Sequence, residues 1–316
     1  MLLNFKNFCA TLLAIITLIN IQPVSAFASS ENVGLFKEPL RVMLVPTDGG
    51  TEDGTRADFE PIFNALSRTT KLHFKIVVGQ SYASVIEGMA AGLVDIAFVG
   101  PTLYLEAAKK GIAEPLAVAV LNGQSVYYAG FFARPDFTLN GLRDVIGHSM
   151  AFGDMNSSSS FTIQVGMLLE AGVDPTRDLS KIFLTGGHAN SLNALAQGHV
   201  DLSAASFNSY QKAVNNGAIN VTEVVPVASS VPIPYPPFIM ATTLPEGLKT
   251  RLREGFNLVH EDPSVTPEMI RGFGGILVDR YTSEITHETF LAVKKMKDLV
   301  TSEIKSEILK KASDTR

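Results

Sequence analysis

The fold of this chain is decided by residues 149–171, which read SMAFGDMNSSSSFTIQVGMLLEA. Residues 149–152 have the composition of a short strand, a polar turn follows, and serines from Ser157 to Ser160 open a helix-type stretch that ends near Ala171. A strand that turns directly into a helix is the repeating unit of α/β proteins. The segment therefore predicts an α/β fold in which polar groups gather where a strand ends and a helix begins.

The same alternation of strand and helix occurs on both sides of this segment. The upstream stretches, strand-type and helix-type in turn, are 40–45, 58–70, 72–78, 84–91, 95–99 and 102–109. The downstream strand-type stretches are 181–184 and 201–205. This alternation predicts parallel strands joined by crossover helices, arranged as two successive α/β units.

Two extended stretches divide the chain into two expected lobes. Residues 127–133 are apolar, and residues 225–240 are β-type but rich in proline, which suits an extended crossover better than a central strand. We expect a discontinuous first lobe at 36–130 and 240–316 and a second lobe at 131–239. Hinges at the two crossovers would let the lobes close around a ligand in the cleft between them.

The first 26 residues have the features of a cleavable export signal. Lys6 precedes an apolar stretch at 8–21, and small residues lead to an expected cleavage site after Ala26, with Ala28 as the alternative. An apolar stretch of about 14 residues is too short for a membrane anchor, which takes roughly 20. The sole cysteine, Cys9, lies in this leader without the small preceding residues of a lipoprotein site. We expect a free periplasmic protein without disulfides.

The charge balance of the chain argues against nucleic acid as a partner. The chain has 26 Lys and Arg against 31 Asp and Glu, and loss of the leader leaves 25 against 31, a formal charge of −6. No run of basic residues is present. Hydrophobic residues make up 46% and charged residues 18%, which is typical of a folded chain with extensive apolar burial. Any anion must therefore be held by a local site.

The serine run is the strongest local signal for such a site. Hydroxyl groups and unpaired backbone N–H groups at the positive end of a helix dipole together favour an anion. Ordinary N-capping explains one serine, but not four in succession after Asn156. We interpret the run as an anion-binding turn.

Three further residues are candidates because they stand where strands give way to helices. His188 follows two glycines, and it could either bind an anion or cap its own helix. Tyr82 and Tyr104 open two helices of the first lobe, where a phenol could donate to an oxyanion or simply pack.

The sequence offers little for catalysis or metal binding. The six histidines show no i, i+4 pair and have no cysteine partners in the mature chain, so we expect no metal or cofactor. The chain lacks a Gly-x-Ser-x-Gly elbow and a phosphate loop. A pairing of Ser158 with His188 would lack an identifiable orienting acid. We therefore do not expect an enzyme.

Together these segments resemble the phosphonate/phosphite/phosphate-binding family of periplasmic receptors for ABC transporters. The resemblance covers nearly all of the mature chain. It rests on the order and spacing of Ser81-Tyr82, IEGM at 86–89, VDIAFVG at 94–100, DMNSSS at 154–159, Gly187-His188, GHVD at 198–201 and Ile233-Pro234.

The resemblance implies a two-lobed periplasmic binding protein of type II, with a mainly parallel sheet in each lobe and the ligand between the lobes. It implies that the chain delivers a phosphorus oxyanion to a membrane permease, and we expect a monomer. The implied ligand-binding residues are Tyr82, Tyr127, Ser157, Ser158, Ser159 and His188. Tyr104 becomes a neighbour of the site.

Departures from the family pattern bear on the ligand. Met155 and Ser160 stand where the family often has proline and glycine. Asn208 and Pro236 align with carboxylates that read an aminoalkyl tail in some members, and neither is charged. Without those counter-ions we expect phosphite, methylphosphonate or phosphate rather than 2-aminoethylphosphonate. Binding of another small anion, such as a carboxylate or sulfonate, and service as the sensory partner of a membrane receptor stay open as alternatives.

Overall fold

A computed structural model describes residues 33–47 and 52–314. The expected leader, residues 1–26 with its cleavage site, lies outside the described residues. Within the described ranges, no helix is both long enough and apolar enough to pass through a bilayer.

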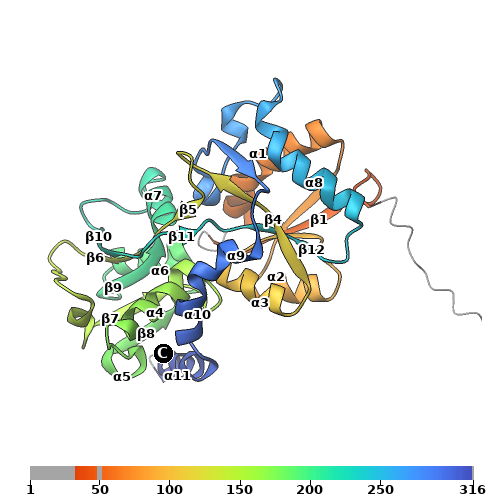
Figure 1. The fold of residues 1–316 in the computed structure, drawn as a ribbon. Helices are drawn as coiled ribbons and strands as arrows, with labels where there is room; N and C mark the ends of the chain where they lie inside the picture. The colour runs from red at the N-terminus through yellow and green to blue at the C-terminus, as the bar shows by residue number, and fades with distance from the viewer. Residues whose placement is uncertain (1–32, 48–51, 315–316) are drawn as a thin grey trace, which may run out of the picture. The chain divides into compact units, whose positions relative to one another are not determined.

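The first of the two larger sheets has six strands (Figure 1). Its strands are β1 (Leu40–Leu44), β2 (Phe74–Val78), β3 (Ile96–Phe98), β4 (Ala113–Val120), β12 (Phe238–Ala241) and β13 (Arg280–Thr282). Their order is β13-β4-β12-β3-β1-β2. Strands β2 and β3 are parallel to β1 on its two sides, whereas β12 is antiparallel to both β3 and β4.

The helices of this region follow from its alternating sequence. They are α1 (Glu52–Thr70), α2 (Tyr82–Ala90), α3 (Pro101–Lys109), α8 (Glu246–Leu258) and α9 (His287–Phe290), with short turns η3 (Val259–Glu261), η4 (Pro267–Met269), η5 (Phe273–Gly275) and η6 (Leu291–Val293). Helix α1 buries Phe59, Ile62, Phe63 and Leu66, the i, i+3, i+4, i+7 stripe of a core-facing helix. The rings of Phe59 and Phe98 lie 4.4 Å apart, so this stripe packs directly against β3.

The second of the larger sheets has five strands. Its strands are β6 (Ala129–Ala133), β7 (Ser149–Phe152), β8 (Lys181–Leu184), β9 (Leu202–Ser206) and β10 (Val225–Ser229). Their order is β10-β6-β9-β7-β8, so Pro226 lies in an edge strand, where its missing N–H costs no central ladder bond. The helices are η1 (Leu142–Val145), η2 (Ser158–Thr162), α4 (Ile163–Glu170), α5 (Pro175–Asp178), α6 (His188–Ala196) and α7 (Phe207–Asn215).

Both faces of the second sheet are buried. Because successive side chains of a strand point to opposite faces, neighbouring residues belong to different apolar clusters. Met150 and Phe152 of β7 belong to one apolar cluster, whereas Ala151 between them belongs to another. Phe131 and Phe132 of β6 divide in the same way. The sheet is therefore a middle layer, as in other α/β units.

The chain passes between the sheets at two short paired strands. Strands β5 (Val126–Tyr127) and β11 (Ile233–Pro234) pair antiparallel with each other. Because strands that enter and leave the crossovers run antiparallel to their neighbours, both sheets are mixed. The predicted α/β class with sheets flanked by helices is confirmed, and the parallel part of each sheet is confined to its strand–helix–strand units.

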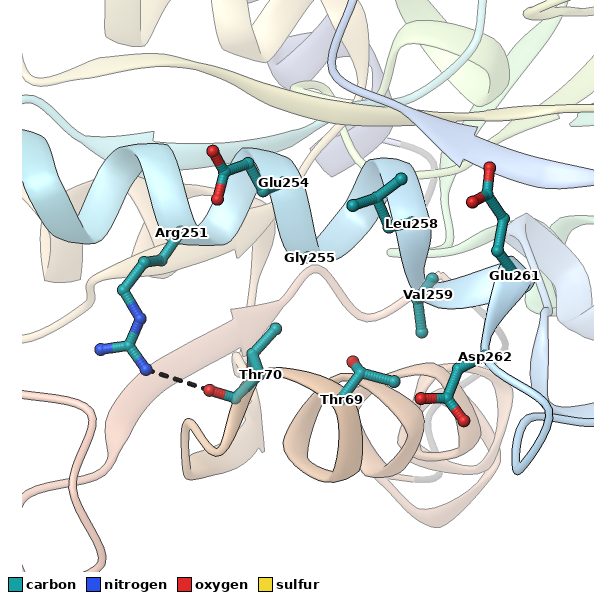
Figure 2. A pocket seen from close by; sticks show the side chains of 9 residues that line it. All are labelled: Thr69, Thr70, Arg251, Glu254, Gly255, Leu258, Val259, Glu261 and Asp262. Atoms are coloured by element: carbon teal, nitrogen blue, oxygen red, sulfur yellow. Dashed lines mark hydrogen bonds between the residues drawn. The ribbon is translucent and has the colours of Figure 1, made fainter.

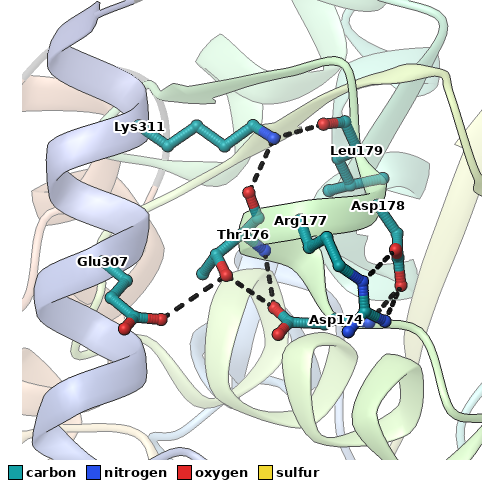
Figure 3. Close-up of polar contacts among 7 residues, drawn as sticks. All are labelled: Asp174, Thr176, Arg177, Asp178, Leu179, Glu307 and Lys311. Atoms are coloured by element: carbon teal, nitrogen blue, oxygen red, sulfur yellow. Dashed lines mark hydrogen bonds and ion pairs between the residues drawn. The ribbon is translucent and has the colours of Figure 1, made fainter.

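The last helices reach the second sheet, which differs from the expected place of residues 240–316. Helix α10 (Lys294–Leu299) contacts α4, and α11 (Ser302–Asp314) packs on β8 and α5. Ile308 and Ala312 join the core of the second sheet. The Lys311 ammonium donates to the carbonyl of Thr176 over 2.8 Å and also to that of Leu179 (Figure 3). The lobe boundaries stay a prediction, but this packing groups α11 with the second sheet.

Candidate functional site

A small cavity lies where the two sheets face each other. The space free of protein atoms in the cavity and at its opening is about 230 Å³. The residues that line it are Val45, Thr47, Tyr82, Phe98, Gly100, Tyr127, Ser157, Ser159, His188, Pro236 and Phe273.

The topology explains why these residues meet. Val45 and Thr47 follow β1, and Gly100 follows β3. From the second sheet, Ser157 follows β7 and His188 follows β8. In each sheet these are carboxyl ends of adjacent or next-adjacent parallel strands, the edge at which open α/β sheets bind ligands.

The serine run opens its helix with a π-type turn. The N–H of Thr162 donates to the carbonyl of Ser157 over 3.0 Å, an i to i+5 bond, and the turn η2 precedes α4. The Ser157 hydroxyl oxygen accepts the N–H of Ser160 over 3.2 Å, so it caps this helix and keeps its proton for another acceptor. π-Type turns are frequent at functional sites because they reorient side chains within a helix.

Ser159 belongs to a buried hydroxyl pair with Tyr127. The two side chains are hydrogen-bonded, and Tyr127 comes from the crossover strand β5. Burial raises the pKa of Tyr127 well above its usual value, and the bond to Ser159 opposes this only in part. The phenol is therefore protonated at neutral pH and can act as a donor.

His188 is held as a neutral donor by its surroundings. Its Nδ1 accepts the backbone N–H of Ser206 over 3.0 Å, and the residue is 1% exposed. Since Nδ1 is an acceptor in this bond, the neutral ring carries its proton on Nε2. The ring of Phe273 lies edge-on to the imidazole with centroids 5.7 Å apart, which fixes the ring plane.

Thr47 contributes a buried hydroxyl group that has no hydrogen-bond partner among the described residues. Leaving a buried hydroxyl unsatisfied costs on the order of 1–3 kcal/mol. Because Thr47 lines the cavity, a ligand oxygen there would remove that cost. Tyr82 lines the same cavity from the first turn of α2.

Among the described residues that line the cavity, none has a charged side chain. Asp154 lies just before the serine run, and burial raises its pKa, although hydrogen bonds from the backbone N–H groups of Asn156 and Tyr82 oppose the rise. The apolar lining residues Val45, Phe98, Pro236 and Phe273 all come from the first-sheet side. The cavity thus offers neutral donors to an anion and an apolar wall to a small substituent. No set of three metal-ligating side chains occurs within the described ranges.

Three residues predicted for the site lie outside this cavity. The Ser158 hydroxyl bonds Thr102 instead. The Asn208 amide donates to the carbonyl of Phe273 over 3.2 Å. The Tyr104 hydroxyl lies 3.1 Å from Nδ1 of His287. Each is therefore occupied by a protein partner, whereas Tyr82, Tyr127, Ser157, Ser159 and His188 are brought together.

Thr47 and Phe273 are lining residues that the sequence interpretation missed. Thr47 could have been found, because it stands just after a predicted strand at 40–45, as the other candidates do. Phe273 has no comparable signal, since it reaches the cavity from the irregular η5 turn. The hydroxyl of Tyr235 accepts the N–H of Phe273 over 2.7 Å and helps to hold it there.

A wider surface hollow, with an empty volume of about 810 Å³, lies between the end of α1 and α8 (Figure 2). It presents the carboxylates Glu254, Glu261 and Asp262. Its one basic residue, Arg251, already donates to the carbonyl of Thr70 over 3.0 Å. An anion would be repelled there, so size alone does not identify the binding site.

Comparisons with known proteins point to one family. The family model described as "ABC transporter, phosphonate, periplasmic substrate-binding protein" matches residues 49–275. The Phosphate-import protein PhnD of Mycolicibacterium smegmatis is 33% identical over 177 residues, which cover 52% of this chain and 54% of that protein. The match therefore spans about half the length of that relative.

Two solved structures are similar over most of their length. A binding protein component of an ABC phosphonate transporter from Pseudomonas aeruginosa has a TM-score of 0.72 and 18% identity, covering 88% of this chain and 98% of that one. PhnD1 from Prochlorococcus marinus in complex with methylphosphonate has a TM-score of 0.71 and 14% identity, covering 82% and 97%. At these identities the likeness shows the shared fold.

Proposed function

We infer that this chain, which belongs to the family of periplasmic substrate-binding proteins of phosphonate ABC transporters, captures a small phosphorus oxyanion in its interlobe cavity. It would then deliver that ligand to a membrane permease. The protein is a binding component of a transporter and not an enzyme.

One observation carries the proposed ligand class: the cavity combines several neutral donors with an apolar wall and no charged lining side chain. Tyr82, Tyr127, Ser157, Ser159 and His188, with the hydroxyl of Thr47, would donate to the ligand oxygens. Low dielectric strengthens such bonds inside a closed cleft. The absence of a carboxylate among the described lining residues leaves an ammonium group without a counter-ion.

The same lining supports a ligand with a small, uncharged substituent. The rings of Phe98 and Phe273, with Val45 and Pro236, would meet that substituent. We propose phosphite, methylphosphonate or phosphate. The M. smegmatis relative is named for phosphate import, and the P. marinus structure holds methylphosphonate. Phosphate and methylphosphonate should therefore be tested first.

The proposal also covers the export of the chain and its oligomeric state. We propose that residues 1–26 are removed as a signal peptide and that the mature chain acts in the periplasm as a monomer. Its net negative charge supports a role that does not involve nucleic acid.

The test is a ligand panel on the chain from residue 27 onward. Phosphite, methylphosphonate, phosphate, 2-aminoethylphosphonate, sulfate, taurine and acetate are compared by thermal shift and then by titration calorimetry. A ligand at 100 times its Kd stabilises the native state by about 2.7 kcal/mol, which raises the Tm by several degrees. A response to one of the first three compounds is expected. A response only to taurine or acetate, or to none of the panel, would refute the phosphorus-oxyanion assignment.

A further inference from the structure

Helix α3 has no side-chain cap of its own. Its N-cap is Gly100, which has no side chain, and Pro101 occupies the first turn. The first N–H groups of a helix have no intrahelical acceptor and need a partner. An N-cap side chain usually accepts the N–H two or three residues further on. For α3 that donor is the N–H of Thr102.

Ser158 supplies this missing cap from the other side of the cleft. Its hydroxyl oxygen accepts the Thr102 N–H over 3.0 Å and lies 2.8 Å from Oγ1 of Thr102. Ser158 is 1% exposed and Thr102 is 3% exposed. Thr102 follows β3 of the first sheet, whereas Ser158 follows β7 of the second. The two bonds can therefore form only when the two sheets approach each other.

The space around Gly100 is shaped to this contact. A Cβ atom on Gly100 would lie 2.5 Å from Oγ of Ser158, closer than real Cβ contacts allow. The backbone of Gly100 (φ −72°, ψ 157°) is one that any residue can adopt. The glycine is thus needed for the approach of Ser158 and not for its own conformation.

We propose that Ser158 is a positioning residue that caps α3 in trans and so stabilises the closed cleft. This assignment removes Ser158 from the ligand-binding set implied by the family resemblance. It rests on the proposed function, because closure is the event that traps the ligand. The neighbouring Ser157 and Ser159 line the cavity, and Ser158 between them connects the two halves of the protein.

Three variants test the proposal. Ser158→Ala removes both bonds, and we expect Kd for the best panel ligand to rise about tenfold, mainly through faster dissociation. Gly100→Ala should fold normally but bind weakly, since its Cβ blocks the closed state. The double variant Gly100→Ala/Ser158→Ala should recover part of the affinity lost in Gly100→Ala, because it removes the 2.5 Å contact and leaves the Cβ of residue 158 at 3.2 Å from the new methyl group. Thr102→Ser, which keeps both bonds, is the matched control and should bind like the wild type.

Closure itself is measured by electron–electron distance spectroscopy. The mature chain has no cysteine, so spin labels can be placed at Ala57→Cys and Asn215→Cys, exposed positions on α1 and α7. With ligand bound, Ser158→Ala should show a larger share of long distances than the wild type. Unchanged closure with weaker binding, or no rescue in the double variant, would make Ser158 a ligand contact and overturn the proposal.

The proposed ligand class and the proposed cap of α3 by Ser158 can be refuted independently of each other. If no phosphorus compound shortens the wild-type distance, the proposed ligand class is wrong. The trans cap is then judged with the panel compound that does bind, or without ligand by a shift of Ser158→Ala to longer distances. Identical distance distributions in the wild type and Ser158→Ala would overturn the cap in either case.

Discussion

Replacement of Lys212 by methionine should weaken ligand binding while leaving the ligand-free fold almost unchanged. The Lys212 ammonium on α7 lies 2.6 and 2.7 Å from the two carboxylate oxygens of Asp58 on α1. The two side chains are only 17% and 7% exposed. Since α1 packs against the first sheet and α7 follows β9 of the second, this ion pair joins the two halves of the cleft.

The size of the expected rise in Kd follows from the surroundings of the Asp58 carboxylate once Lys212 is replaced. Removal of one partner of a buried pair costs roughly 3–5 kcal/mol when the remaining charge must stay buried. We propose that opening of the cleft hydrates Asp58, so that the cost falls on the closed state alone. We therefore expect Kd to rise by about 100- to 1000-fold, and the Tm without ligand to change little.

Calorimetry and stopped-flow dissociation with the best panel ligand measure the effect. Gln211→Met, an exposed position on the same helix, is the matched control. The double variant Asp58→Asn/Lys212→Met should recover part of the affinity because it leaves no uncompensated charge. Wild-type affinity in Lys212→Met, or a double variant as weak as the single one, would show that the pair does not contribute to closure.

Three further variants follow from the same contacts. Tyr127→Phe removes a phenol bonded to Ser159, and we expect about a tenfold higher Kd by calorimetry; an unchanged Kd would exclude Tyr127 as a donor. Asn208→Asp places a carboxylate against the carbonyl of Phe273; it should weaken binding of all ligands, and a gain of 2-aminoethylphosphonate binding would contradict this. Lys311→Met removes two bonds from α11 to carbonyls at and after α5, so the Tm should fall by a few degrees; an unchanged Tm would show that apolar packing alone holds α11.

The sequence predicts the local units of this fold well. Each strand–helix unit up to α3 is encoded in a contiguous stretch in which a strand-type run is followed by a helix-type run, and the expected strand at 181–184 coincides with β8. The antiparallel strands and the place of α11 were not predicted. Both depend on which sheet a segment joins after a crossover, and a helix such as α11 has the same amphipathic pattern whichever sheet it covers.

The site shows the same division between local and long-range information. The serine run and His188 could be proposed as candidates because their signal lies within one strand–helix junction. The hydrogen-bond partners that distinguish Ser158 from Ser157 and Ser159 could not be predicted in this way. Thr102 lies 56 residues before Ser158, and only the approach of the two sheets brings their hydroxyls together.

The proposed closure contacts would explain how a negatively charged protein could hold an anion without a lysine or arginine among the described residues of the cavity lining. An oxyanion among neutral donors gains strength only if water is excluded, because hydrogen bonds are stronger at low dielectric. Exclusion of water requires a stable closed state, which the Asp58–Lys212 pair and the Ser158 cap of α3 would provide at positions outside the cavity lining. In this proposal the hydroxyl groups and His188 would contact the ligand oxygens, and the ring of Phe273 would contact the substituent.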